Sequence, residues 1–120
     1  MPESDRPVME TIAAMTTASL ENSDLLPREL MIARVAALIA LDAPAASYAL
    51  NIEVAADAGL TLDDVQDVLI AVAPIVGATR VTSAVGNLAE GLGLVIALAE
   101  AELEAEAELA EADGLSSSDA

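Results

Sequence analysis

The chain has 120 residues, contains neither cysteine nor histidine, and carries 21 acidic against four basic residues, a formal net charge of −17. The missing cysteines exclude disulfides, thiolate metal sites and cysteine nucleophiles, and the missing histidines remove the commonest general base and metal ligand. One aromatic residue, Tyr48, cannot form a base-stacking surface and the negative charge repels phosphate backbones, so the sequence predicts no nucleic-acid partner, no metal and no cofactor.

The apolar segments are too short to suggest a membrane protein. None reaches the roughly 18 to 20 residues that span a bilayer, because the longest are broken by Arg34, Pro74 or Gly77. The N-terminal "MPESDRPVM" has acids and proline where a secretory signal would have bases followed by an apolar stretch. We therefore expect a soluble, cytoplasmic protein with no membrane partner.

Apolar residues recur at helical spacing along most of the chain, and alanine, leucine and glutamate are frequent. This pattern predicts an all-α fold, a single small helical domain of five to six helices over residues 8–99. We expect a disordered N-terminus over 1–7, an acidic helical extension over 100–113 and a disordered tail over 114–120.

The first two helices are expected on either side of "ENSDLLP". The first carries the stripe Val8, Ile12, Met15 and Ser19. The second begins with Pro27, which is tolerated early in a helix, and continues through "PRELMIARVAALIAL". Its apolar face is so wide that it must be largely buried.

Capping residues predict the next two helices. Asp42 is a good N-cap for a third helix, with Pro44 in its first turn and Gly59 just beyond its last turn. Thr61 as N-cap and Asp64 three residues later resemble a capping box for a fourth helix.

A fifth helix is expected to start near residues 78–79, after Pro74 and Gly77 stop or kink the fourth. The "GLGL" of residues 91–94 lies inside its helical pattern with no strand before it, which indicates close helix packing and not a nucleotide-binding loop. Glutamates at every second position of residues 100–113 repel one another, so we expect the helix to fray there.

Ser47 and Asn51 are the first candidates for chemistry. They are four residues apart, so on a helix they share a face and could together bind a ligand carbonyl or hydroxyl. Alternatively, they satisfy each other, a backbone carbonyl or a buried water. Neither is a base near pH 7, and no histidine is present to activate Ser47 for acyl transfer.

Four further residues are candidates, three of them with an ordinary structural alternative. Glu29, held among apolar neighbours, could transfer a proton, or it could complement the dipole of the first helical turn. Arg34 could bind a ligand or pair with a carboxylate at a subunit contact, and Arg80 could clamp an anion or neutralise neighbouring acids. Tyr48 completes the candidate ligand-binding set.

The order of three segments resembles the carboxymuconolactone decarboxylase and alkylhydroperoxidase D family. The segments are "LPRELMIARVAAL", "AADAGLTLDDVQDVL" and "VGATRVTSAVGNL", and the resemblance covers roughly Leu25 to Leu92. It implies small all-α subunits that form homo-trimers or homo-hexamers through their long helices. The mean hydropathy of +0.55 suits such an assembly, because a domain this small has more apolar residues than a monomer core readily hides.

The segment that corresponds to the functional helix of that family lacks the family's characteristic residues in this sequence. The family histidine stands eight residues before the glycine of the Ala-Gly-Leu turn, and counting back from Gly59 gives Asn51. Ser47 stands where the peroxidase branch has the second cysteine of a CxxC and the decarboxylase branch has an acid, and Pro44 stands at the first cysteine. Only Glu29 matches a family acid. The resemblance therefore does not carry over thiol peroxidase activity.

Two hypotheses follow for the function. In the first, the protein is a pseudoenzyme, a non-peroxidase homo-oligomer that serves as a structural or interaction protein or binds a small metabolite in the former active site. In the second, it is an active enzyme of decarboxylase or isomerase type that uses Glu29 with Ser47 and Asn51.

Overall fold

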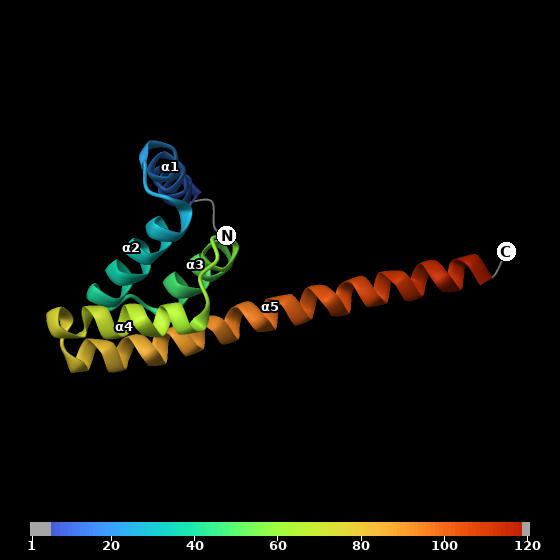
Figure 1. Ribbon diagram of the computed structural model, residues 1–120. Coiled ribbons are helices and arrows are strands. Elements are labelled where there is room, and N and C mark those ends of the chain that lie inside the picture. The colour runs from blue at the N-terminus through green and yellow to red at the C-terminus, as the bar shows by residue number, and fades with distance from the viewer. Residues whose placement is uncertain (1–5, 119–120) are drawn as a thin grey trace.

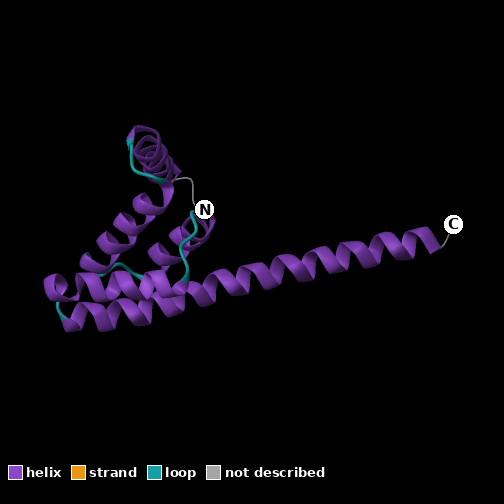
Figure 2. Ribbon diagram, viewed as in Figure 1, coloured by secondary structure: helices purple, strands orange, loops and turns teal. Residues whose placement is uncertain are grey.

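The computed structural model describes residues 6–118, which form five helices joined by short turns and contain no strand (Figures 1 and 2). The helices are α1 (Arg6–Asn22), α2 (Pro27–Ala40), α3 (Ala45–Asp57), α4 (Leu62–Val76) and α5 (Ala78–Ser118). The predicted all-α fold is thus confirmed.

The core lies between α2, α3, α4 and the first half of α5. As predicted, α2 is deeply embedded, and its Met31 and Ile39 are each only 1% exposed. The opposite wall comes from the amphipathic α4 and from Ala84 of α5. The buried residues are Leu30, Met31, Val35, Ile39, Ala43, Tyr48, Ala55, Leu60, Val65, Val68, Leu69 and Ala84.

α1 stands apart from this core, at the upper end of the view in Figure 1. None of its residues is buried, so its apolar stripe of Val8, Ile12 and Met15 lies on the surface. One hydrogen bond ties it to α2, from Arg34 Nη2 to Ser19 Oγ at 3.2 Å. A single helix of this length without packing is marginal in water. A single chain therefore leaves α1 largely unsupported.

The prediction that Asp42 caps α3 is wrong, because Asp42 ends α2 instead. Its φ of 54° is left-handed, and its backbone N–H donates to the Ile39 carbonyl at 3.2 Å. The next N–H, that of Ala43, donates to Leu38 O at 3.0 Å, which completes a Schellman motif. Pro44, in extended conformation, is the N-cap of α3.

The other caps lie where the sequence predicted them. Gly59 has a φ of 90° directly after the end of α3. At α4, the Asp64 N–H donates to Thr61 Oγ1 at 3.1 Å and the Thr61 N–H donates to Asp64 Oδ2 at 2.8 Å, a complete capping box. Pro74 lies inside α4 without ending it, and Gly77, with a φ of 88°, marks its end.

α5 begins at Ala78, as expected, and extends well beyond the other helices (Figure 1). It is one continuous helix of 41 residues through the acidic segment, so the fraying expected over residues 100–113 is not observed. It also includes residues 114–118, which the sequence assigned to a tail, and α1 begins at Arg6 instead of Val8. The division into domain, extension and tails stays a prediction, and its residues 1–5 and 119–120 lie outside the described part.

Within residues 6–118, one helical segment, Ala78–Gly114, is long and apolar enough to cross a membrane by length and composition. This corrects the expectation that no segment reaches that limit. Only 11% of its most apolar window is buried in the single chain. Length and composition alone are weak evidence for a membrane span, because core helices of soluble proteins pass the same test.

Candidate functional site

A pocket of about 200 Å³ opens between α2, α3, α5 and the turn that leads into α4. Ten of the residues that line it are apolar and three are polar, and none is charged. The apolar residues are Val35, Leu38, Ile52, Ala55, Ala56, Leu60, Leu62, Val65, Leu88 and Leu92, and the polar residues are Tyr48, Asn51 and Thr61. The pocket therefore offers an apolar wall with few polar groups, as ligand sites commonly do.

Gly91 allows α5 to pack closely against α3 beside this pocket. A Cβ atom built on Gly91 would lie 2.8 Å from the Ala45 carbonyl oxygen and 3.0 Å from Tyr48 Cβ. Only a glycine allows the two helices to approach so closely. The close packing predicted from "GLGL" is thus confirmed at Gly91, whereas a Cβ on Gly93 would meet nothing within 4 Å.

Tyr48 is the most unusual side chain of the pocket. It is 2% exposed, and its hydroxyl is buried without a hydrogen-bond partner among the described residues. Burial raises the pKa of this hydroxyl, and the negative charge of Asp42 raises it further. The hydroxyl therefore keeps its proton near neutral pH and is a hydrogen-bond donor that lacks an acceptor.

Ser47 and Asn51, the predicted pair on α3, differ in their surroundings. Asn51 lines the pocket, and its Nδ2 donates to the Ser47 backbone carbonyl at 2.8 Å. This corresponds to the alternative in which the polar pair satisfies a backbone carbonyl. The Ser47 side chain is half-buried and is not among the residues that line the pocket.

Glu29 is exposed at the start of α2 and is not among the lining residues. Its Oε1 accepts a hydrogen bond from the Leu26 N–H at 3.0 Å. Glu29 therefore satisfies a backbone N–H at the start of the helix that has no partner within the helix. This matches the structural alternative for Glu29. Its role in catalysis stays a prediction.

Both predicted ligand-binding arginines are engaged with other parts of the chain. Arg34 is half-buried and donates to Ser19 of α1, as described above. Arg80 Nη1 donates to the Ala40 carbonyl at 2.8 Å and thereby satisfies the C-terminus of α2. Neither lines the pocket.

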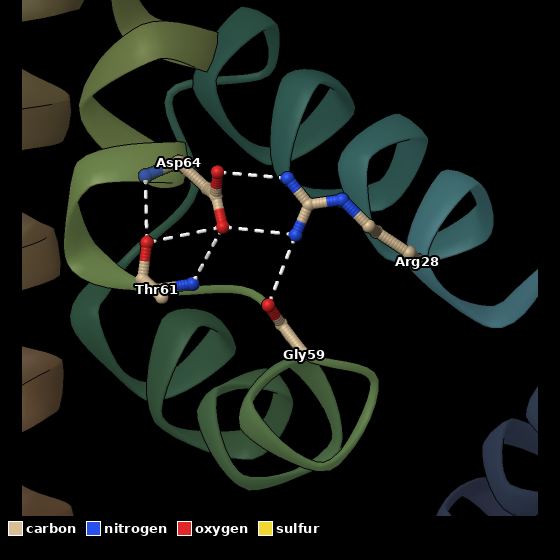
Figure 3. Close-up of polar contacts among 4 residues, drawn as sticks. All are labelled: Arg28, Gly59, Thr61 and Asp64. Carbon is tan, nitrogen blue, oxygen red and sulfur yellow. Dashed lines mark hydrogen bonds and ion pairs between the residues drawn. The ribbon is translucent and has the colours of Figure 1, made fainter.

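Sequence reasoning missed Arg28, which holds the pocket's edge together (Figure 3). Its Nη1 and Nη2 donate to the two carboxylate oxygens of Asp64 at 2.9 and 2.8 Å, and Nη1 also donates to the Gly59 carbonyl at 2.9 Å. The hydrogen bond from Arg28 is the main cause that lowers the pKa of Asp64. The clamp therefore joins α2 to the turn that carries Leu60 and Thr61 of the pocket.

Because Asp64 also belongs to the capping box, the Thr61 hydroxyl makes two hydrogen bonds with it. It donates to Asp64 Oδ2 at 3.0 Å and accepts from the Asp64 N–H. Among the described residues, no group of three or more acidic side chains is arranged to hold a metal ion. The pocket is thus an apolar cavity whose lining includes three polar side chains and no charged one.

Of three comparisons with known proteins, one gives a match. Neither the comparison with curated proteins nor the comparison with solved structures gives a match. A family model, however, matches residues 6–90, from the start of α1 to the part of α5 that crosses α3, and leaves the acidic end of α5 outside. By this match, the chain belongs to the carboxymuconolactone decarboxylase family.

Proposed function

We propose that the protein binds a small, largely apolar molecule in the pocket between α2, α3 and α5, and that it does so without the thiol chemistry of its family. The chain contains no cysteine, so neither the peroxidatic nor the resolving thiol exists. The observation that carries the proposal is the lining of the pocket, in which ten of the thirteen residues are apolar and none is charged.

The pocket has a size that supports this role. An enclosed apolar cavity on the order of 150 Å³ accommodates a benzene ring, so about 200 Å³ suits a ring of six atoms with one substituent.

Cyclohexanone is a suitable probe of the pocket. We expect it to shift the methyl NMR signals of Val35 and Leu88 saturably, with a dissociation constant on the order of millimolar, as suits so few atoms. The variant Ala56→Leu adds bulk at an exposed position that lines the pocket and should abolish the shifts. The matched control Ala71→Leu, on the exposed side of α4, should leave them unchanged. Equal shifts in both variants would rule the proposal out.

In this proposal, the protein acts as a cytoplasmic homo-oligomer, a trimer or hexamer by analogy with its family. Support comes from the exposed apolar residues of α1 and of the distal part of α5, which a partner subunit would cover. The first half of α5 packs on α3 and α4 and carries the buried Ala84 and Gly91, as expected of a helix in a soluble bundle. Glu90 and the acidic residues beyond it argue against a bilayer around this helix.

The alternative function, an enzyme built on Glu29, Ser47 and Asn51, has no specific observation in its favour. Asn51 lines the pocket, but Glu29 is bound to the Leu26 amide and Ser47 is not a lining residue. The binding role, in contrast, rests on the apolar, uncharged lining of the pocket.

A further inference from the structure

We propose that α1 of one subunit binds in a groove between α3 and α5 of a second copy of this chain. This inference rests on the homo-oligomer of the proposed function and specifies which two surfaces of the subunits meet.

The groove is separate from the ligand pocket and has a volume of about 680 Å³. Its α3 side is formed by Ala46, Ala49, Leu50 and Glu53, and its α5 side by Leu94, Val95, Ala97 and Leu98. The four residues of α3 have the i, i+3, i+4, i+7 spacing of one helix face. Seven of the eight lining residues are apolar, and Leu50 is 75% and Leu98 65% exposed. An apolar groove of this kind can bind the apolar face of an amphipathic helix.

α1 is the helix whose apolar face lacks a cover. Over residues 6–118, it packs against no other helix of its own chain, and none of its residues is buried. Val8, Ile12 and Met15 stand at i, i+4 and i+7, which is the spacing of a helix that binds in a groove. The hydrogen bond between α1 and α2 is made at Ser19, beyond these three residues. The apolar stripe of α1 is therefore accessible to a partner.

Charge favours α1 over the distal part of α5, which also exposes apolar residues. Residues 100–113 include seven acidic side chains, and the groove contains Glu53, so like charges would meet if this segment entered the groove. α1 carries only two acidic residues, Glu10 and Glu21. With 3.6 residues per turn, both lie on the side of the helix opposite its apolar stripe. α1 can thus enter the groove of an acidic subunit without placing a carboxylate next to Glu53.

The proposed contact also fits a closed assembly. The stripe of α1 and the groove are different surfaces, so each subunit gives its α1 to one neighbour and receives that of another. Such heterologous contacts form closed rings when the rotation between subunits permits, and the trimer of the proposed function is a ring of this kind.

Cysteine cross-linking tests the contact directly, because the wild-type chain contains no cysteine. Two double variants combine Ile12→Cys with Leu50→Cys or with Leu98→Cys, and all three positions are exposed in the single chain. Each variant is treated with a short bis-maleimide and analysed by denaturing electrophoresis and peptide mass spectrometry. At least one of them should give chains linked from position 12 to the groove of another chain.

The matched controls replace Ile12→Cys with Ala14→Cys, which lies on another side of α1 and is also exposed. The yield of linked chains should be at least about fivefold higher for position 12 than for position 14, because a held contact raises the effective concentration of the two thiols. Equal yields from both positions would overturn the inference.

Two further results would also overturn it. Links from position 12 to the groove of the same chain would mean that α1 covers its own subunit. Links between two copies of position 12, found in the single variant Ile12→Cys and in place of the groove link, would mean that α1 helices pair with each other.

Failure of the inference is distinguishable from failure of the proposed function. If light scattering shows an oligomeric wild type and no groove link forms, only the arrangement of the subunits is wrong. A wild-type monomer at micromolar concentration, in low and high salt, would overturn both the arrangement and the homo-oligomer. The binding of cyclohexanone is measured independently of either outcome.

Discussion

α5 crosses α3 at the point where Gly91 faces Tyr48, so closely that a Cβ atom on Gly91 would lie 3.0 Å from Tyr48 Cβ. The same atom would lie 2.8 Å from the Ala45 carbonyl oxygen, which belongs to the backbone and cannot move aside as a flexible side chain could. This contact sets the distance between the helix that carries the pocket's polar groups and the helix that closes it.

The variant Gly91→Ala should therefore destabilise the fold. Crowding in a packed interior costs about 1 to 3 kcal/mol, which exceeds the roughly 1 kcal/mol that alanine gains over glycine inside a helix. Gly93→Ala is the matched control, because its Cβ meets nothing within 4 Å and it should stabilise the fold by about 0.4 to 1 kcal/mol. Urea unfolding followed by circular dichroism measures both. A Gly91→Ala variant as stable as Gly93→Ala would contradict the close crossing.

The Arg28 clamp predicts how stability depends on acid. Because the folded-state pKa of Asp64 is lowered below the unfolded value of about 4, its ionised form stabilises the fold above that value, and this contribution is lost as the pH falls further. Asp64→Asn should thus be less stable than wild type at pH 6 and should lose less stability between pH 5 and pH 2.

The control for this prediction is Asp63→Asn, which removes the same charge from the same first turn of α4. It should follow the wild-type curve between pH 5 and pH 2, because the ion pair of Arg28 in Figure 3 is formed with Asp64. Urea midpoints measured across that range decide the matter. Parallel curves for wild type and Asp64→Asn would show that the clamp contributes nothing.

The sequence predicted the helices well because their ends depend on local chemistry. Thr61 and Asp64 are three residues apart, and Gly59 acts through its own backbone, so each is readable from a short segment. Asp42 misled the prediction because an aspartate suits both a helix start and a left-handed helix end. Its actual place depends on the Schellman hydrogen bonds of α2.

The site was less predictable, because its decisive contacts join distant parts of the chain. Arg28 and Asp64 are 36 residues apart, and Gly91 meets Tyr48 only after α5 has folded back on α3. Tyr48 was among the candidate ligand-binding residues. That its hydroxyl would be buried without a partner follows from the packing of α3 and has no signature in the sequence.

The absence of thiols predicts that the protein does not reduce peroxides with a dithiol. The reaction requires a thiolate, and the chain encodes none. Peroxide consumption with dithiothreitol as reductant should therefore equal that of a heat-inactivated sample. Turnover clearly above this background would contradict the prediction.

A triple variant tests whether the cysteine pair of the family's peroxidase branch can form at the start of α3. Pro44→Cys, Ser47→Cys and Asn51→His together restore the family's residue types at these positions, and Ser47→Cys alone is the control. The triple variant should form an intrahelical disulfide on oxidation, because the N-cap and the third helical residue after it lie on one side of the helix start. Mass spectrometry with thiol alkylation should show two reactive thiols that disappear together. Two thiols that stay reactive after mild oxidation would mean that the helix start does not bring these positions within bonding distance.

The last prediction concerns assembly, which the exposed face of α1 motivates. Val8 is 59% and Met15 66% exposed, with Ile12 between them on the same stripe, in a helix with no buried residue. An isolated helix of this length is marginal, so a second subunit is expected to cover it. Light scattering should give a mass three or six times the 12.1 kDa of one chain.

Two variants and a salt series sharpen this test. Ile12→Glu with Met15→Glu places charge on the apolar stripe and should lower the mass, whereas Ala14→Glu, on another side of the same helix, should preserve it. Because each subunit carries a formal charge of −17, added salt should screen repulsion between subunits and favour assembly at a given protein concentration. A soluble wild-type monomer at micromolar concentration, in both low and high salt, would disprove the assembly.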